Sequence, residues 1–224
     1  GLPCGNKPNP NTPFFSFACF TFSTNYYRTM SKIPSPEALR DLLRSRSSIF
    51  PAMYTDEPID DAIIEEMLEN ANWAPNHKKT EPWRFKVIKG AARQRLAEEL
   101  SSTYKRVTPE ASFSEKKFSK LSKIPMRAGA LIAICMKRDP AESLPEWEEI
   151  AAVAMAVQNI WLTATAYGLG GYWSSPGIVK HLGEFLGLED GERCLGLFYL
   201  AHHKAPEIPR ERGAIADKVE WMRE

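Results

Sequence analysis

The stretch that decides the fold is residues 149–177, EIAAVAMAVQNIWLTATAYGLGGYWSSPG. The 18 residues from Ile150 to Tyr167 carry no charge, so the stretch is long enough to be tested as a membrane span. Alanine is its commonest residue, and its small, amide and hydroxyl side chains suit contact with other helices better than contact with lipid. We therefore expect a buried core helix from about Glu149 to Gly168 and no membrane partner.

The rest of the chain has the composition of an ordinary globular protein. Of the 224 residues, 43% are hydrophobic and 25% are charged, which excludes disordered, collagen-like and coiled-coil chains. The formal net charge of +1 provides no overall field that would hold nucleic acid. The histidines and cysteines lack the spacing of metal ligands, so we expect neither a metal site nor a nucleic-acid partner. Cys135 and Cys194 fall in apolar runs, which predicts buried, reduced thiols and favours a cytoplasmic location.

Helices and strands are predicted on both sides of the core helix. The expected helices are Ser35–Arg46, with Ser35 as its N-cap, a second that begins at Asp60 and ends before Pro75, and Ala91–Leu100. The expected strands are Trp83–Ile88, Ala130–Met136 and Cys194–Ala201. In the first strand we expect Trp83, Phe85 and Val87 to form the buried face. This mixture predicts a single α+β or α/β domain in which helices cover a small mixed sheet.

Three further segments fall outside this pattern. Residues 1–29 are rich in proline and aromatic residues and poor in charge, so we expect an N-terminal extension that precedes a single domain over residues 30–224. The basic stretch Thr103–Arg127 predicts an exposed amphipathic helix with a solvated lysine face; the alternatives are steering of an anionic cofactor and weak nucleic-acid binding. Residues 204–224 are expected to form an extended arm.

Two polar groups in the first part of the chain are candidates for ligand binding. Arg46, Ser47 and Ser48 follow the first helix, where a guanidinium and two hydroxyl groups can donate hydrogen bonds to phosphate oxygens. The alternative role of Arg46 is to complement the helix dipole. The loop over residues 73–83 is bounded by prolines and carries amide, imidazole and ammonium donors at residues 76–78; the alternative is a capped loop with solvated cations.

Two more candidate groups lie towards the C-terminus. Residues 168–177, GLGGYWSSPG, follow the core helix directly and lack the third glycine of the dinucleotide-binding pattern G-x-G-x-x-G. The glycines allow close backbone approach, so we expect a loop whose amides near residues 173–175 donate to a flat ring. Arg210 and Arg212 offer a second clamp for an anion.

Together these motifs resemble the nitroreductase family of flavoproteins. The resemblance extends from about Glu37 to Gly196, and more loosely through residues 212–221. It is carried by the leucine-containing helix that ends at residues 46–48, by A-P-x-H-K-x-x-x-P-W over residues 74–83, and by G-x-G-G-x-W-x-S over residues 168–175. The order is similar to that of the small single-domain members, whose loop carries histidine where larger members have asparagine.

The resemblance implies an α+β fold with a mixed, mostly antiparallel sheet covered by helices, and an intertwined homodimer that binds FMN at the subunit interface. The residues implied to bind FMN are Arg46, Ser47, Ser48, Trp73, His77, Trp173, Ser174, Ser175 and Arg212. The first three would hold the phosphate and ribityl chain, Trp73 and His77 would contact the flavin of the partner subunit, residues 173–175 would lie along the ring, and Arg212 would contact the phosphate. Residues 163–168 would receive the nicotinamide.

The resemblance also implies an NAD(P)H oxidoreductase: NADH or NADPH gives hydride to flavin N5, and a nitroaromatic, a quinone or another electron-poor acceptor then takes it. No catalytic side chain is expected, although Arg46, His77 and Lys78 are candidates to offset charge on the reduced flavin. The alternatives are a flavin reductase or dehydrogenase for another acceptor, and a flavin-binding protein without turnover. Ser47 and Glu81 depart from the family pattern, where a basic residue and an amide are usual, and we expect them to weaken FMN affinity or shift the flavin potential.

Overall fold

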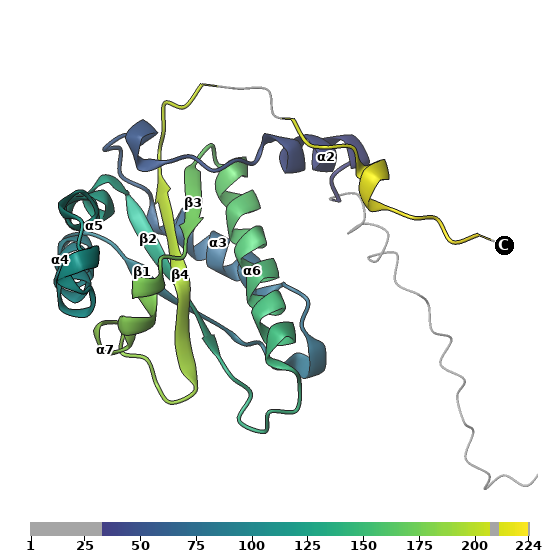
Figure 1. Ribbon diagram of the computed structural model, residues 1–224. Coiled ribbons are helices and arrows are strands. Elements are labelled where there is room, and N and C mark those ends of the chain that lie inside the picture. The colour runs from purple at the N-terminus through teal and green to yellow at the C-terminus, as the bar shows by residue number, and fades with distance from the viewer. Residues whose placement is uncertain (1–32, 207–210, 224) are drawn as a thin grey trace, which may run out of the picture. The chain divides into compact units, whose positions relative to one another are not determined.

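The computed structural model describes residues 33–206 and 211–223, whose arrangement Figure 1 shows. The chain divides into two compact units, Gly1–Leu39 and Arg40–Glu224. The hydroxyl oxygen of Ser35 accepts a hydrogen bond from the amide of Ala38 at 3.2 Å, so Ser35 caps α2 (Pro36–Ser45) as the sequence predicts. The second unit contains the sheet and the other helices. The predicted extension over residues 1–29 lies outside the described residues.

A four-stranded sheet forms the middle of the second unit. Its strands are β1 (Trp83–Ile88), β2 (Ala130–Lys137), β3 (Gly170–Ser174) and β4 (Glu192–Ala201), in the order β1-β2-β4-β3. All three strand pairs are antiparallel, which confirms the α+β class. The sheet was expected to be mixed and mostly antiparallel. A long helix connects β2 to β3 as in a parallel crossover, but β4 lies between these two strands, and the parallel contact of the described sheet is the single bridge between Ser48 and Gly171 of β3.

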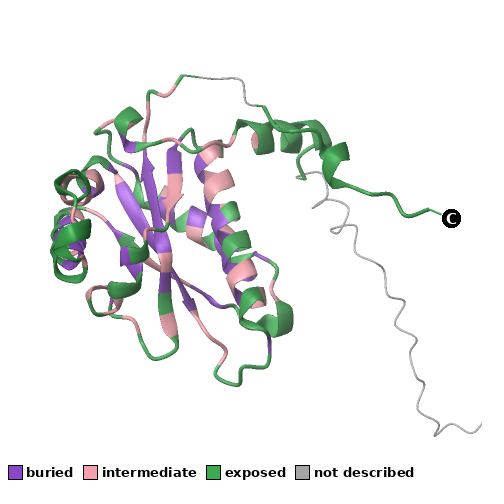
Figure 2. Cartoon of the chain, in the orientation of Figure 1, coloured by how far each residue is buried: buried purple, intermediate pink, exposed green. Residues whose placement is uncertain are grey.

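Helices cover both faces of the sheet (Figures 1 and 2). The α-helices of this unit are α3 (Asp61–Asn72), α4 (Ala91–Val107), α5 (Glu115–Arg127), α6 (Glu146–Ala166) and the short α7 (Gly183–Leu186). Short 3₁₀ turns cover Pro51–Met53, His77–Lys79, Glu110–Ser112, Gly177–His181 and Ile215–Lys218. α3 and α6 pack on one face of the sheet, and α4 and α5 pack on the other.

Strand β2 is buried on both faces, which explains its continuous apolar sequence. Ile132 and Ile134 belong to the core under α3 and α6, whereas Leu131 and Ala133 belong to the core under α4 and α5. Because successive side chains of a strand point to opposite faces, both sets must be apolar when both faces are covered. The sequence prediction of two fully covered strands is therefore confirmed for β2, and Cys135 and Cys194 are free, buried thiols as expected.

The predicted buried face of β1 is wrong at one position. Trp83 is buried and Phe85 packs against the core, but Val87 is 43% exposed. β1 lies at the edge of the sheet, and the core formed by α3 and α6 covers only the first part of the strand. Ile88, on the opposite face, is buried against the other core instead.

Helix α4 continues to Val107 instead of ending near Leu100. The polar residues that suggested an early end bond within the helix: the Ser101 hydroxyl donates to the carbonyl of Ala97 at 2.9 Å. Tyr104, one turn later, is buried and holds the extended part of the helix against the core. The basic stretch is thus divided between the end of α4 and α5, and its lysines on α5 are exposed as predicted.

The glycine-rich segment expected to be a loop is strand β3, and it packs closely on β4. A Cβ atom added at Gly171 would lie 2.7 Å from the carbonyl oxygen of Tyr199 and 2.7 Å from Cζ of Phe198. These distances are shorter than any normal van der Waals contact. Glycine is therefore required here by the approach of the neighbouring strand, which the sequence alone does not reveal.

Replacing Gly171 by alanine should lower the free energy of unfolding by about 1–3 kcal/mol, the usual cost of overpacking. The added methyl group would meet a backbone oxygen, which cannot move without distorting the β3–β4 pairing. Urea denaturation followed by circular dichroism measures the change. Gly177→Ala is the matched control, because its methyl group would meet no atom within 4 Å. Equal stability of Gly171→Ala and the wild type would contradict the close packing of β3.

Candidate functional site

A cavity of about 900 Å³ lies at the C-terminal end of α6. Three parts of the chain meet there: the end of α2 with residues 46–49, the end of α6 with residues 168–169, and the segment that follows β4. The described lining residues are Leu43, Arg44, Ser45, Arg46, Ser47, Ile49, Thr165, Gly168, Leu169, His203, Ala205, Pro206 and Arg212.

The lining is rich in cations and hydroxyl groups. Arg44, Arg46 and Arg212 supply three guanidinium groups, and Ser45, Ser47 and Thr165 supply hydroxyl groups. Among the described lining residues none is aspartate or glutamate. Guanidinium groups bind phosphate with paired, charge-assisted hydrogen bonds, and no nearby carboxylate in the lining competes for them. The cavity therefore fits a ligand that carries a phosphate or a similar anionic group.

Trp161 of α6 holds the first part of this lining in place. Its indole ring lies under the guanidinium group of Arg46, whose Cζ is 4.4 Å from the ring centroid. Its Nε1–H donates to the carbonyl oxygen of Ser47 at 3.1 Å. On its other side Trp161 packs edge-to-face on Phe198 of β4, with 5.3 Å between the ring centroids. The core helix thus fixes both the charge and the backbone of the residues that line the cavity.

Residues 48–49 are fixed in the same way by β3. Ser48 forms a parallel bridge with Gly171, and the amide of Ile49 donates to the carbonyl of Gly171 at 3.0 Å. Ser48 itself is therefore beside the cavity, at the start of β3, without belonging to its lining. Strand β3 then continues away from Gly171 through Trp173 and Ser174, and Ser175 follows its end.

Of the nine residues predicted to bind a flavin, the structure places Arg46, Ser47 and Arg212 in the lining of this cavity. Ser48 and residues 173–175 are connected to it through β3 but do not line it. Trp73, at the end of α3, and His77 do not line the cavity, and His77 lies near the other end of α6. Residues 165 and 168, from the segment predicted to receive a nicotinamide, do line the cavity.

His77 is bound to the N-terminal end of α6. Its Nδ1 atom lies 2.7 Å from Oε2 of Glu148, and the neighbouring Lys78 donates from Nζ to the carbonyl of Ser143 at 3.0 Å. Glu148 and Thr165 are 17 positions apart on one helix, a distance of about 25 Å at 1.5 Å per residue. Trp73 is 78% exposed and donates from Nε1 to Glu69, one turn earlier in α3. The cavity and the His77 loop of one chain are therefore separate.

The loop around His77 carries backbone strain. Lys78, Lys79 and Glu81 have φ values of 52°, 55° and 42°, in the left-handed region that residues other than glycine rarely adopt. The amide of Glu81 donates to Oδ1 of Asn76 at 3.1 Å, which closes the loop on itself. Such strain persists only where the surrounding structure enforces it, and it occurs often at ligand sites.

The segment that supports this loop is itself rigid. The Ser143 hydroxyl and the amides of Ser143 and Ala141 donate to the Asp139 carboxylate and hold the pKa of that carboxyl below its usual range. Arg138 pairs with the buried Glu149 of α6, whose other oxygen accepts from the amide of Asp139. The residues that bind His77 and Lys78 are thus held by a connected network at the start of α6.

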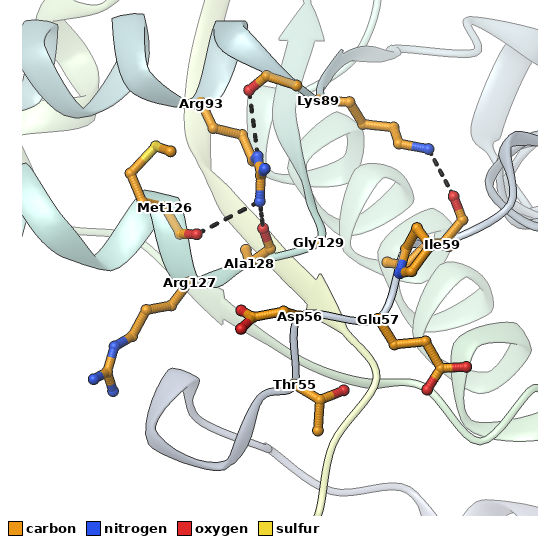
Figure 3. A pocket seen from close by; sticks show the side chains of 12 residues that line it. Thr55, Asp56, Glu57, Ile59, Lys89, Arg93, Met126, Arg127, Ala128 and Gly129 are labelled. Carbon is orange, nitrogen blue, oxygen red and sulfur yellow. Dashed lines mark hydrogen bonds between the residues drawn. The ribbon is translucent and has the colours of Figure 1, made fainter.

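A second pocket, of about 290 Å³, lies between residues 55–59, the start of α4 and the end of α5 (Figure 3). Two of the three cations in its lining bind backbone oxygens: Arg93 donates to the carbonyl oxygens of Ala128 and Met126, and Lys89 donates to the carbonyl of Ile59 at 2.7 Å. The lining also includes the carboxylates of Asp56 and Glu57. This pocket is therefore smaller than the cavity at the end of α6 and less suited to an anionic ligand.

No group of three or more histidine, cysteine, aspartate or glutamate side chains in the described residues is arranged to hold a metal ion. None of the helices in the described part of the chain is long and apolar enough to cross a membrane.

Sequence reasoning missed three residues of this site. Arg44 lies one residue before the end of α2, Trp161 lies inside the core helix, and His203 follows β4. Trp161 carried no signal, because an aromatic residue in a core helix is expected to pack in the core. The pair His202-His203 directly after a predicted strand was a signal, and only the structure shows which of the two faces the cavity.

Comparison with known proteins decides the family. The family model described as the nitroreductase family matches residues 43–202. The chain belongs to the nitroreductase family. Membership confirms the prediction of an oxidoreductase and extends over the core helix, the cavity residues 43–169 and strand β4.

Relatives support this assignment over most of the chain. YfhC of Bacillus subtilis (strain 168), whose name assigns it provisionally to the NAD(P)H nitroreductases, is 30% identical over 195 residues, which cover 85% of this chain and 97% of YfhC. The crystal structure of a nitroreductase-like family protein from Bacillus cereus has a TM-score of 0.69 and 27% identity, covering 85% of this chain and 98% of that one. The FMN-dependent nitroreductase NfnB from Mycobacterium smegmatis, solved in complex with NADPH, has the same fold, with a TM-score of 0.64 and 17% identity over 84% of this chain and 99% of that one.

Proposed function

We propose that this nitroreductase-family chain is an FMN-dependent NAD(P)H oxidoreductase. The observation that carries the proposal is the cavity at the end of α6, which gathers three guanidinium groups and three hydroxyl groups with no carboxylate among its described lining residues. This donor set fits the phosphate of FMN. When bound, FMN supplies two-electron chemistry, accepting hydride at N5 from NADH or NADPH and passing it to an electron-poor acceptor such as a nitroaromatic or a quinone.

The chain's own residues would bind and orient this cofactor. Arg46 and Arg212 hold the phosphate, and Ser47 and Ser48 bind the phosphate or the ribityl chain. Residues 173–175, at the end of β3, lie along the flavin ring. Arg46 is pre-oriented for this role by its stacking on Trp161, so little side-chain entropy is lost on binding. Thr165 and Gly168 line the same cavity, which supports the proposal that the nicotinamide is received beside the flavin.

We also propose that two copies of the chain complete each flavin site. Neither Trp73 nor His77 lines the cavity of its own chain, and His77 is bound at the opposite end of α6, so we place their flavin contacts in the partner subunit's site. Large apolar side chains remain exposed in the described structure, including Trp73, Trp147 and Phe50 at 78%, 67% and 57%. A second copy of the chain would remove this area from water. The strained loop at residues 78–81 would then be part of the interface.

The dimer is tested by sedimentation of the FMN-loaded protein. We expect a species of twice the 25.3 kDa chain mass at all concentrations where FMN remains bound. Trp147→Ser removes an exposed apolar side chain and should shift the protein towards monomer with loss of FMN, whereas Val107→Ser, at a position 42% exposed on α4, should change neither. A stable monomer that retains FMN would contradict the proposal.

The residues 30–224 would form the single FMN-binding domain and residues 1–29 an extension outside it; the described cavity lining, which falls within residues 43–212, supports this division. The free, buried thiols of Cys135 and Cys194 support a cytoplasmic location. The alternative is a flavin reductase or dehydrogenase for another acceptor. Turnover of NADH or NADPH with a panel of nitroaromatics, quinones and enones distinguishes these acceptors, and absence of turnover with all of them would favour a flavin-binding protein.

Arg46→Ala should weaken FMN binding by about 1.5–3 kcal/mol, roughly 10- to 150-fold, because a charged hydrogen bond to the phosphate is lost. Fluorescence titration of the apoprotein with FMN measures the change. Arg95→Ala is the matched control, since Arg95 is exposed on α4 and outside the cavity, and it should bind FMN as the wild type does. Unchanged FMN affinity in Arg46→Ala would reject the phosphate site at this cavity.

A further inference from the structure

We propose that His203 is a further FMN-binding residue of the cavity, and that it donates a hydrogen bond from Nε2–H to a phosphate oxygen of the ligand. The inference rests on the proposed function, because it assumes that FMN occupies this cavity. His203 lines the cavity together with Arg46 and Arg212, the two residues expected to contact the phosphate. No motif of the sequence assigned this histidine a role.

The hydrogen bond at the other ring nitrogen decides which nitrogen of His203 carries the proton. The amide of Ala205 donates to Nδ1 of His203 at 3.1 Å. A nitrogen that accepts a hydrogen bond is unprotonated, so in the neutral ring the proton is on Nε2. Within the described residues Nε2 has no protein partner, so this N–H remains available to a ligand in the cavity.

The backbone that carries His203 is fixed on both sides. His203 forms an antiparallel bridge with Tyr54, and the flanking residues continue this pairing: the amide of Thr55 donates to the carbonyl of His202, and the amide of Lys204 donates to the carbonyl of Met53, both at 2.9 Å. The segment after β4 is therefore held as an ordered ladder. The imidazole is presented to the cavity from a rigid position.

Gly170 provides the space in which the ring lies. A Cβ atom added at Gly170 would be 2.7 Å from Cδ2 of His203 and 2.8 Å from Cβ of Ile49. Cδ2 is the ring atom bonded to Nε2. The start of β3 thus packs directly against the edge of the imidazole that carries the proposed donor, and any other residue at position 170 would displace it.

The surroundings favour the neutral form of the ring. Burial, and secondly the neighbouring His202, lower the pKa of His203 below its ordinary value. The cavity lining that His203 shares with Arg44, Arg46 and Arg212 contains no carboxylate among its described residues, and Glu57 lies 3.8 Å from Nδ1 of His202. Protonation would also place a proton on Nδ1, facing the amide of Ala205. His203 therefore acts as a neutral donor that adds a hydrogen bond without adding charge.

Two substitutions at His203 distinguish loss of the Nε2–H donor from loss of the packing of the imidazole ring. His203→Asn retains an acceptor near Nδ1 but lacks the Nε2 donor, whereas His203→Gln places an amide N–H near the position of Nε2. In titrations of the apoprotein, we expect His203→Asn to weaken FMN binding about tenfold and His203→Gln to weaken it less than about threefold. Riboflavin, which lacks the phosphate, should bind both variants as it binds the wild type. His202→Asn is the matched control and should leave both affinities unchanged.

The pH dependence tests whether the donor is neutral. Because the imidazole of His203 is expected to be neutral in the FMN-free and the FMN-bound protein, the ratio of wild-type to His203→Asn affinity for FMN should stay constant between about pH 6.5 and 8.5. The titration of the FMN phosphate affects both proteins equally and therefore cancels in this ratio. A cationic histidine would instead give a ratio that falls as pH rises through its pKa. A falling ratio would overturn the neutral-donor assignment.

FMN binding by the wild type distinguishes failure of the proposed function from failure of the role proposed for His203. If the wild type binds no FMN, the proposed function fails. If the wild type binds FMN and His203→Asn binds it equally well, or if riboflavin binding falls in parallel with FMN binding, the role of His203 at the phosphate is overturned. Should His203→Asn fail to fold, proton–nitrogen spectra of wild-type protein with ¹⁵N-labelled histidine replace it. We expect the Nε2–H signal of His203 to shift with FMN and not with riboflavin, and the absence of any shift with FMN would also overturn the proposal.

Discussion

The contact between Trp161 and residues 46–47 is the interaction on which the candidate site depends. One aromatic side chain of the core helix stacks on the guanidinium group of Arg46 and donates to the carbonyl of Ser47. Phe198 of β4 packs edge-to-face with the same ring. Because Trp161 is half-buried and packs against the hydrophobic core, the charged end of the cavity is positioned by the same packing that stabilises the fold.

The length of α6 imposes the second constraint. The cavity lies at its C-terminal end and the strained loop around His77 lies at its N-terminal end, so the two are separated within one chain. The proposed dimer would bring the loop of one chain to the cavity of the other. It would also give a reason for the left-handed conformations at residues 78–81 and for the network through Asp139 and Glu149 beside them, since a loop that contacts a ligand of the partner would need to be held in one conformation.

Much of this architecture could be predicted because continuous apolar segments of the sequence indicate buried helices and strands. The continuous apolar run of β2 marks a strand that is covered on both faces, and the uncharged stretch marks the core helix, of which one side is buried while residues such as Met155 stay exposed; both elements were predicted close to their observed bounds. The exposure of Val87 could not be predicted, because it depends on how far the covering helices extend over an edge strand. Strand β3 was missed since its glycines suit a loop equally well, and only the approach of Phe198 and Tyr199 requires them in a strand.

Residues of the candidate site could be predicted only where charged or hydroxyl side chains form a recognisable local motif in the sequence. Arg46 and Ser47 were found because a cation and a hydroxyl follow a helix end, and Arg212 because it lies in a basic arm. Trp161 and His203 act through contacts with residues more than 30 positions away in sequence, such as the hydrogen bond from Trp161 to Ser47 and the bridge between His203 and Tyr54. Such contacts follow from the tertiary fold; the pair His202-His203 after a predicted strand is the only local signal for either residue, and it does not indicate which histidine faces the cavity.

The most direct test of the account is anaerobic stopped-flow absorbance of the full chain loaded with FMN. The account predicts that NADH or NADPH bleaches the flavin absorbance, and that after removal of the nicotinamide a nitroaromatic or a quinone restores it. Dithionite provides the control that the bound flavin can be reduced. Bleaching by dithionite but by neither nicotinamide would contradict the central claim that this cavity holds the flavin of an NAD(P)H oxidoreductase.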